Sequence, residues 1–240
     1  MASFSDGGLA ARVKADFANI WKPAALIRLE SPTKQRETFR SAHKLAVCFT
    51  ALANAVSNLP AHQRAFLQEA ASDSLHMLHV LMNGDVRGAR FYLRSIVENF
   101  WRHQYFAEHR IEFDWLTSKS KYKMTALSLR EYSAALDCFA GPIDLCRQGL
   151  ERGYVELSTE VHSSSMRTLV LRERLDDIKL TVAQSTAFGK QMNAIMKDVL
   201  ALITVGWPDV FGSIHVHTQA FILSCLDATR RQRRQNSLSL

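Results

Sequence analysis

Helical patterns separated by a few chain breakers are the feature that most constrains the fold of this sequence. The chain has no run of alternating apolar and polar residues between turn signals, the pattern that predicts a β-strand. Its 240 residues include only ten glycines and five prolines, and 47% are hydrophobic, which is typical of a chain that buries a core. The sequence therefore predicts an all-α protein, a helical bundle of about seven helices.

Capping and breaker residues divide the chain into these helices. Ser31-Pro32 offers an N-cap followed by proline at the first helical position. Asn83-Gly84 is a helix stop, and Asp85 caps the helix that follows it. Helices are expected over residues 32–59, 61–82, 86–109, 124–139, 145–161 and 209–229. Because the turn at Asn83-Gly84 is short, the helices over 61–82 and 86–109 should pack antiparallel.

The segment after the Ser163-Ser164-Ser165 cluster has apolar or small residues at alternating spacings of four and three. They are Leu171, Leu175, Ile178, Val182, Ser185, Gly189, Met192, Met196, Val199 and Ile203. This heptad pattern predicts one long helix that ends at Gly206-Trp207-Pro208. Its seam either packs within the bundle or forms a subunit interface, and a homodimer is expected.

Charge and pattern divide the chain into three parts: an N-terminal arm (1–31), a helical bundle domain (32–229) and a basic flexible tail (230–240). The formal net charge is +7, and four of the positive charges lie in Arg230-Arg231-Gln232-Arg233-Arg234. Such a segment is either a frayed, solubilising end or a contact to nucleic-acid phosphate or an acidic partner.

The cysteines and the apolar stretches bear on location. Cys48, Cys138, Cys146 and Cys225 form no CxxC pair, and we expect them to be small core residues in a reducing compartment. The first residues lack the apolar region of a secretory signal, and no uninterrupted apolar stretch approaches the roughly 20 residues that span a bilayer. The sequence predicts a cytoplasmic protein that does not contact a membrane.

A polar stripe follows the predicted helix after Asp85. Its members are Arg87, Arg90, Arg94, Glu98, Arg102 and His109. At about 100° per residue, all except Arg90 lie within roughly 80° of one another, while the apolar residues of the helix point elsewhere. The stripe is either a solvated face or the floor of a site for an anion.

A second polar face is predicted on a later helix, where steps of four place Tyr154, Ser158 and His162 on one side. A bundle can bring this face against the arginine stripe. An arginine would then hold a phosphate through a bidentate contact, and His162 would move a proton near neutral pH. The candidate catalytic residues are thus Arg94, Glu98 and His162, and the candidate substrate-binding residues are Arg87, Arg90, Tyr154 and Ser158.

These groups are those that a metal-independent ribonuclease needs. The 2′-hydroxyl of RNA attacks the adjacent phosphorus, so the protein has only to shuttle protons and stabilise developing charge. In the structural alternative, Arg94 and Glu98 form an i to i+4 ion pair, and His162 is a capping or buried histidine. The chain would then be a non-enzymatic interaction module that binds a protein partner or a nucleoprotein complex.

The segments Leu93–Glu98 and Tyr154–His162 resemble segments of uncharacterised bacterial helical proteins near the HEPN superfamily. The resemblance covers residues 61–162 and implies an RNA-directed effector of a phage-defence or toxin–antitoxin module. It also implies an antitoxin or other protein partner and two sites that face each other across a homodimer.

HEPN ribonucleases usually have an arginine and a following histidine with four to six residues between them. Arg102 and His109 have this spacing and form a competing catalytic pair, but Arg36 and His43 have it too. His162 has no arginine at this spacing, so no family role is carried over to it.

No metal or cofactor is expected. Asp73, His76 and His79 are three residues apart, a spacing that keeps only neighbouring pairs on one helix face. The sequence also has neither a GxSxG elbow nor a Gly-rich phosphate loop, which argues against serine hydrolase and P-loop chemistry.

Overall fold

The prediction of an all-α fold is confirmed by the computed structural model, which describes residues 8–21, 28–162 and 178–239. These ranges hold eleven α-helices, two 3₁₀ segments and one isolated parallel bridge, between Leu29 and Leu180. The α-helices are α1 (Gly8–Ile20), α2 (Pro32–Ala55), α3 (Ala61–Met82), α4 (Val86–Phe106), α5 (Arg110–Ser118), α6 (Ala126–Ala134), α7 (Asp144–Val161), α8 (Val182–Gly206), α9 (Pro208–Ser213), α10 (Val216–Cys225) and α11 (Ala228–Leu238). The 3₁₀ segments are η2 (Asp137–Phe139) and η3 (Gly141–Ile143). None of the helices in the described ranges is long and apolar enough to cross a membrane.

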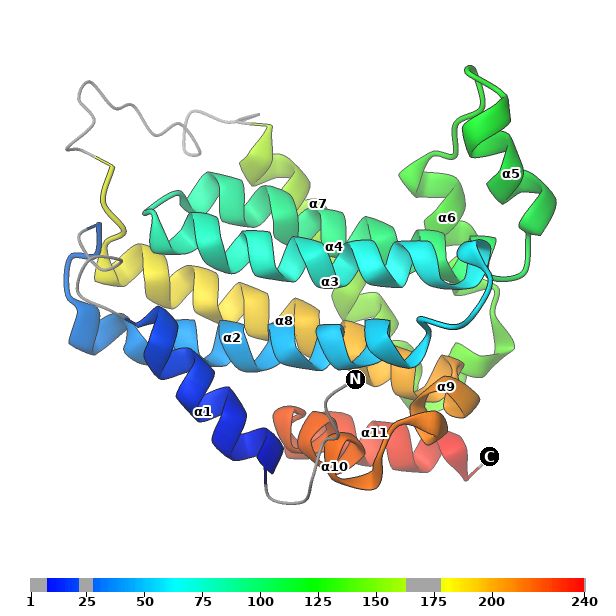
Figure 1. Ribbon diagram of the computed structural model, residues 1–240. Helices are drawn as coiled ribbons and strands as arrows, with labels where there is room; N and C mark the ends of the chain where they lie inside the picture. Colours follow the sequence, from blue (N-terminus) through cyan, green and yellow to red (C-terminus); the bar gives the residue numbers. More distant parts are fainter. Residues whose placement is uncertain (1–7, 22–27, 163–177, 240) are drawn as a thin grey trace.

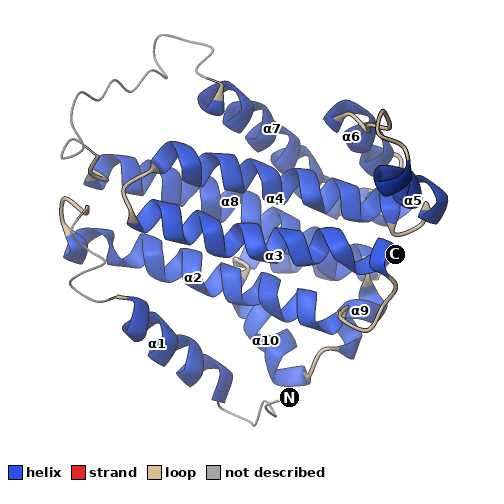
Figure 2. Cartoon of the chain, turned by 45° about the horizontal axis from the view of Figure 1, so that its top comes forward, coloured by secondary structure: helices blue, strands red, loops and turns tan. Residues whose placement is uncertain are grey.

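Consecutive helices form the body of the molecule. Helices α3 and α4 run antiparallel as predicted, and α2 lies beside α3 in the opposite direction (Figure 2). Helix α8 lies against α2, α4 and α7, and α11 also packs against it (Figure 1). Phe39 of α2 and Met192 of α8 lie in the layer between these two helices, and neither has any exposed surface.

Helix α8 is shorter at its start than the heptad pattern predicts. It begins at Val182 because Thr181 accepts a hydrogen bond from the backbone of Gln184 while the Gln184 side chain accepts one from the Thr181 backbone, a capping box. Leu171 and Leu175 of the predicted seam lie outside the described residues. Every residue from Asp198 to Val205 is buried, so burial does not distinguish a heptad seam in this half of the helix.

Three other helix predictions were wrong in their extent. Helix α4 ends at Phe106, so His109 leaves the polar stripe and instead takes the N-cap position of α5. The helix expected over 124–139 stops at Ala134 and continues as η2, and Gly141, at φ +74°, begins η3. The helix expected over 209–229 is broken into α9 and α10.

The C-terminal segment is a docked helix rather than a flexible tail up to Leu238. The Asp227 side chain caps α11, and Arg230 reaches back to the buried Asp198 of α8 with an Nε–Oδ1 distance of 2.8 Å. The same guanidinium pairs with Asp227 and donates to the backbone oxygen of Ala194. Arg230 of this basic segment therefore holds α11 against α8, a role that the composition of the segment did not predict.

The N-terminal arm and the cysteines also differ from expectation. Helix α1 packs on α2 and α10 with Val13 and Phe17 buried, and Asp16 lies 2.6 Å from the Nε2 of His43. Cys48 and Cys146 are buried as predicted. However, Cys138 is exposed and Cys225 is partly exposed, so not all four are core residues.

Replacing Arg230 should lower the free energy of unfolding more than an ordinary surface substitution would. Arg230→Met leaves the carboxylate of Asp198, whose side chain is 6% exposed, without its ion-pair partner. Losing one member of a buried pair costs about 3 kcal/mol, which urea denaturation measures. The double variant Asp198→Leu/Arg230→Met should recover most of this loss, and equal losses in both variants would contradict the role of the pair.

A second stability prediction concerns His103 of α4, which is 3% exposed. Burial lowers its pKa to about 4, whereas an unfolded chain binds the proton near pH 6.5. The unfolded state therefore binds more protons between these values, and the free energy of unfolding should fall as the pH drops from about 6.5 to about 4. The contribution of His103 to this decrease in the free energy of unfolding should approach about 3 kcal/mol.

The pH dependence of unfolding in His103→Phe provides the comparison, since this variant lacks the titrating group but keeps a ring. Its free energy of unfolding should change less than that of the native chain across the same pH window. Parallel curves would show that His103 is not held neutral in the fold.

Candidate functional site

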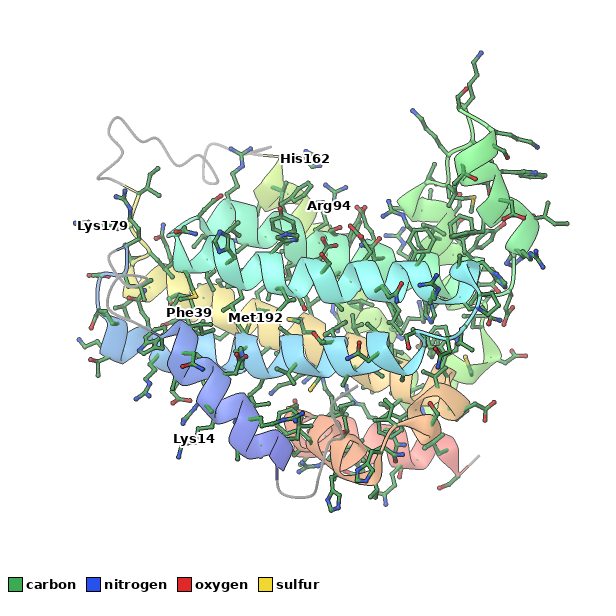
Figure 3. The ribbon with its side chains drawn as sticks, viewed as in Figure 1. Lys14, Phe39, Arg94, His162, Lys179 and Met192 are labelled. Atoms are coloured by element: carbon green, nitrogen blue, oxygen red, sulfur yellow. The ribbon has the colours of Figure 1, made fainter. Side chains whose placement is uncertain are left out.

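The two predicted polar faces do meet, at the surface where α4 packs against α7 (Figure 3). Helix α4 begins at the predicted cap, because the Asp85 side chain accepts a hydrogen bond from the backbone N–H of Gly88. Helix α7 ends at Val161, and His162 is its exposed C-cap residue. The contact places Arg94 of α4 beside Tyr154 and His162, 60 and 68 residues further along the chain.

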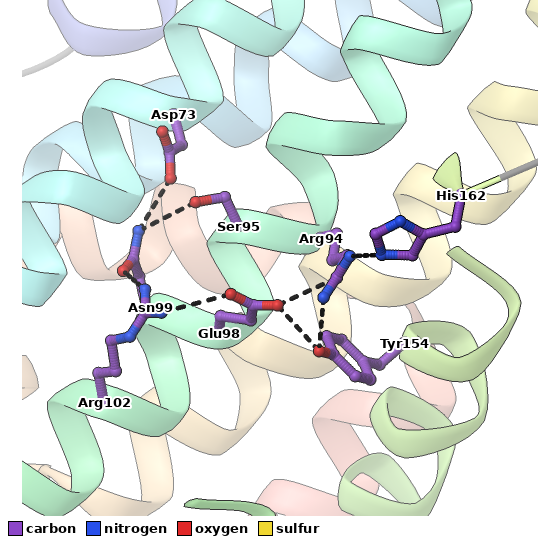
Figure 4. A network of polar contacts seen from close by, with 8 residues as sticks. All are labelled: Asp73, Arg94, Ser95, Glu98, Asn99, Arg102, Tyr154 and His162. Carbon is purple, nitrogen blue, oxygen red and sulfur yellow. Dashed lines mark hydrogen bonds and ion pairs between the residues drawn. The ribbon is translucent and has the colours of Figure 1, made fainter. Parts of the chain in front are cut away.

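Arg94 is the centre of this cluster (Figure 4). Its Nη1 lies 2.6 Å from the Nε2 of His162, and its Nη2 donates to the hydroxyl of Tyr154 at 3.2 Å. Its Nε lies 3.0 Å from the Oε1 of Glu98, an ion pair without the alignment of a hydrogen bond. Because an arginine only donates, His162 accepts through Nε2, so its proton lies on Nδ1 when the ring is neutral.

Tyr154 of α7 contacts both the polar cluster, through its hydroxyl, and the apolar core, through its ring. The hydroxyl donates to the Oε1 of Glu98 at 2.8 Å, and the ring packs edge-on against the fully buried Trp101. Burial raises the pKa of Tyr154, and the hydrogen bond to Glu98 adds to this. Burial alone would lower the pKa of Arg94, but Tyr154 and Glu98 outweigh it and raise the pKa. The phenol therefore stays protonated and the guanidinium stays charged.

A branch of polar contacts leads from Glu98 into the protein. Arg102 donates to the Oε2 of Glu98 at 3.4 Å and to the side-chain oxygen of Asn99 at 2.9 Å. Asn99 in turn donates to the Oδ2 of Asp73 at 2.8 Å and to the hydroxyl of Ser95 at 3.4 Å. Burial raises the pKa of Asp73. The cluster is thus anchored in the α3–α4 interface as well as in α7.

The first two arginines of the stripe hold the end of α7. Arg87 donates through Nε and Nη2 to the backbone oxygen of Val161, at 3.1 and 2.7 Å, and so satisfies a carbonyl at the helix end. The Nε of Arg90 lies 2.9 Å from the Oε2 of Glu160, which also accepts from Gln191 of α8. Both side chains predicted to bind substrate therefore position the turn that carries His162.

The remaining predicted site residues, Ser158 and His109, make no hydrogen bond with Arg94 in the part of the chain that the structure describes. The hydroxyl of Ser158 is buried without a hydrogen-bond partner. His109 lies 2.7 Å through Nδ1 from the backbone oxygen of Tyr105, whose ring it stacks on, and its ring packs edge-on against Tyr132. Arg102 and His109, the competing catalytic pair, share none of these contacts, so the described residues do not bring the pair together.

Sequence reasoning missed Asn99 and Glu160. Asn99 interrupts an apolar face of α4 three residues before Arg102, and an amide at such a position is a signal for a buried partner. Glu160 carries no comparable signal, because its partners Arg90 and Gln191 lie on other helices. In the described part of the chain, no three His, Cys, Asp or Glu side chains gather as a metal site would require.

Comparisons with protein-family models, curated proteins and solved structures find no match to this chain. The HEPN resemblance therefore stays a prediction.

Removing the Tyr154 hydroxyl tests whether it bonds the two helices together. Tyr154→Phe deletes the donor to Glu98 and the acceptor of Arg94, so the free energy of unfolding should fall by about 1 to 2 kcal/mol in urea denaturation. Ser158→Ala on the same helix is the matched control, because its hydroxyl has no partner and its loss should cost nothing. A Tyr154→Phe variant as stable as the control would contradict these hydrogen bonds.

Proposed function

We propose that this chain binds RNA at the exposed edge of α4 and α7 and cleaves it without a metal ion. The observation that carries the proposal is the 2.6 Å approach of the Arg94 guanidinium to His162 Nε2. It joins a fixed positive charge to an imidazole that can act as a general base, on a surface that substrate can reach. These are the two components that cleavage by the 2′-hydroxyl requires.

In the proposed reaction, a phosphate of the RNA replaces His162 as the partner of Arg94 Nη1. The released Nε2 of His162 then takes the proton of the 2′-hydroxyl, and the 2′-oxygen attacks the adjacent phosphorus. The bond from phosphorus to the 5′-oxygen breaks, and the leaving 5′-oxygen takes a proton from water. The products are a 2′,3′-cyclic phosphate and a 5′-hydroxyl end.

Arg94 acts on the charge that develops on the phosphate oxygens during this step. Glu98 and Tyr154 position its guanidinium, since both bind it from the protein side. Arg102, whose side chain is 35% exposed, offers a second positive charge about two turns further along α4 than Arg94, for another phosphate of the RNA.

The resemblance to HEPN proteins places such an activity in a bacterial phage-defence or toxin–antitoxin module. In this proposal the protein is cytoplasmic and acts as a homodimer, and a protein partner such as an antitoxin covers the α4–α7 edge. The predicted heptad seam of α8 contacts α2, α4 and α7, so a dimer interface would have to use another surface.

A non-enzymatic interaction module is the second candidate, and one observation favours it. Each nitrogen of the Arg94 guanidinium already has a partner within the chain, as expected where an ion pair and a cap serve only to hold helices together. In this case the exposed Arg102 would bind an acidic partner, and His162 would have no role beyond the end of α7.

Cleavage of total cellular RNA in the presence of EDTA separates the two candidates. The nuclease proposal predicts discrete fragments with 2′,3′-cyclic phosphate ends, and His162→Ala should lower the rate at least about 100-fold. The melting temperature of His162→Ala should stay within about 2 °C of that of the native chain, because His162 is exposed at a helix end.

His109→Ala is the matched control, since His109 lies outside the Arg94 cluster. Loss of cleavage in His109→Ala alone would move the catalytic role to the Arg102–His109 pair. Absence of cleavage by the native chain would contradict the nuclease proposal. Salt-dependent RNA binding that Arg102→Glu weakens and His162→Ala does not would then support the interaction module.

A further inference from the structure

A cavity of about 460 Å³ opens at the end of the bundle where α9 follows α8. The end of α2, the start of α3 and the end of α4 form its other walls, and the labelled helices meet there in Figure 1. Its lining includes Ala55, Leu59, His103, Trp207, Pro208 and Val210. The volume falls within the range of small-ligand sites, which are also mainly apolar with a few polar groups.

His103 is a largely buried polar group in the wall of this cavity, and it is 3% exposed. Neither ring nitrogen has a hydrogen-bond partner among the described residues; Nδ1 is fully buried, so Nε2 is the nitrogen that a ligand in the cavity can reach. Its ring lies 4.6 Å from the ring of Trp207, which fixes both against the cavity wall. A ligand that hydrogen-bonds to Nε2 in this mainly apolar cavity is stabilised by that bond.

The charge of the lining limits what can bind. Burial lowers the pKa of His103 to about 4, so the ring is neutral at pH 7 and does not attract an anion. Asp209 is the one charged residue among the lining side chains that the structure describes, and it is exposed. With no cation in the lining, a carboxylate or phosphate would be desolvated there without compensation.

We propose that this cavity binds a small uncharged aromatic molecule of one or two rings that carries a hydroxyl group. The rings fill the apolar space beside Trp207 and Pro208, and the hydroxyl hydrogen-bonds to the imidazole of His103. A neutral imidazole has one donor and one acceptor nitrogen, and a hydroxyl can serve either. The site is independent of the proposed RNA cleavage, because the residues of the Arg94 cluster do not line it.

The test uses 2-naphthol, naphthalene and 2-naphthoate as probes, titrated into the full chain and followed by ligand-observed saturation-transfer NMR. The native chain should bind 2-naphthol about 10-fold more tightly than naphthalene, the value of about one hydrogen bond. His103→Phe should remove this difference and leave naphthalene binding unchanged, while His76→Phe, on the exposed surface of α3, should change neither. Ala107→Phe, which places a ring inside the cavity, should abolish binding of both.

Three outcomes would overturn the proposal. They are no binding of 2-naphthol up to about 1 mM, a preference for 2-naphthol that survives in His103→Phe, and 2-naphthoate binding as tightly as 2-naphthol. Should His103→Phe fail to fold, ring ¹⁵N chemical shifts of His103 in the native chain give the same answer. They should change with 2-naphthol and stay constant with naphthalene, and a constant shift with both would contradict the hydrogen bond.

Discussion

The burial of the second half of α8 on all sides is the constraint on which the rest of the structure depends. A helix without a solvated face from Asp198 to Val205 must be covered by other helices, here α2, α4, α7 and α11. Two glycines bring α7 close, because a Cβ on Gly153 would lie 2.7 Å from Ile195, and one on Gly149 would lie 2.8 Å from the Asp198 carboxylate. The position of α7, and so of His162, follows from this packing.

Polar contacts then fix what the apolar packing leaves free. Helices packed through smooth apolar surfaces can slide, whereas Arg87, Arg90 and Arg94 each bind a different group near the end of α7. These contacts lie at the edge of the core and are partly exposed, so each contributes modestly to stability. Their combined effect is to fix the position of the turn that presents His162.

The sequence predicted what depends on local pattern. The all-α class, the cap at Asp85 and the antiparallel packing of α3 and α4 follow from nearby residues, as does the shared face of Tyr154 and His162. The features that the sequence could not predict depend on partners far away in the chain. The docking of α11, for example, needs the contact of Arg230 with the buried Asp198, 32 residues earlier. Likewise, no local signal distinguishes an arginine that binds an anion from Arg87, which caps a helix 74 residues away.

The geometry also relates substrate binding to the proton transfer that we propose. Of the groups that Arg94 contacts, Glu98 and Tyr154 are held on the protein side, and His162 is exposed at a helix end. An incoming phosphate that competes for this guanidinium therefore displaces the histidine at least cost, because the displaced ring regains water as a partner. The same exchange frees the lone pair of Nε2, which Arg94 otherwise occupies. In the proposed reaction, binding of the phosphate and release of the histidine base are therefore a single event.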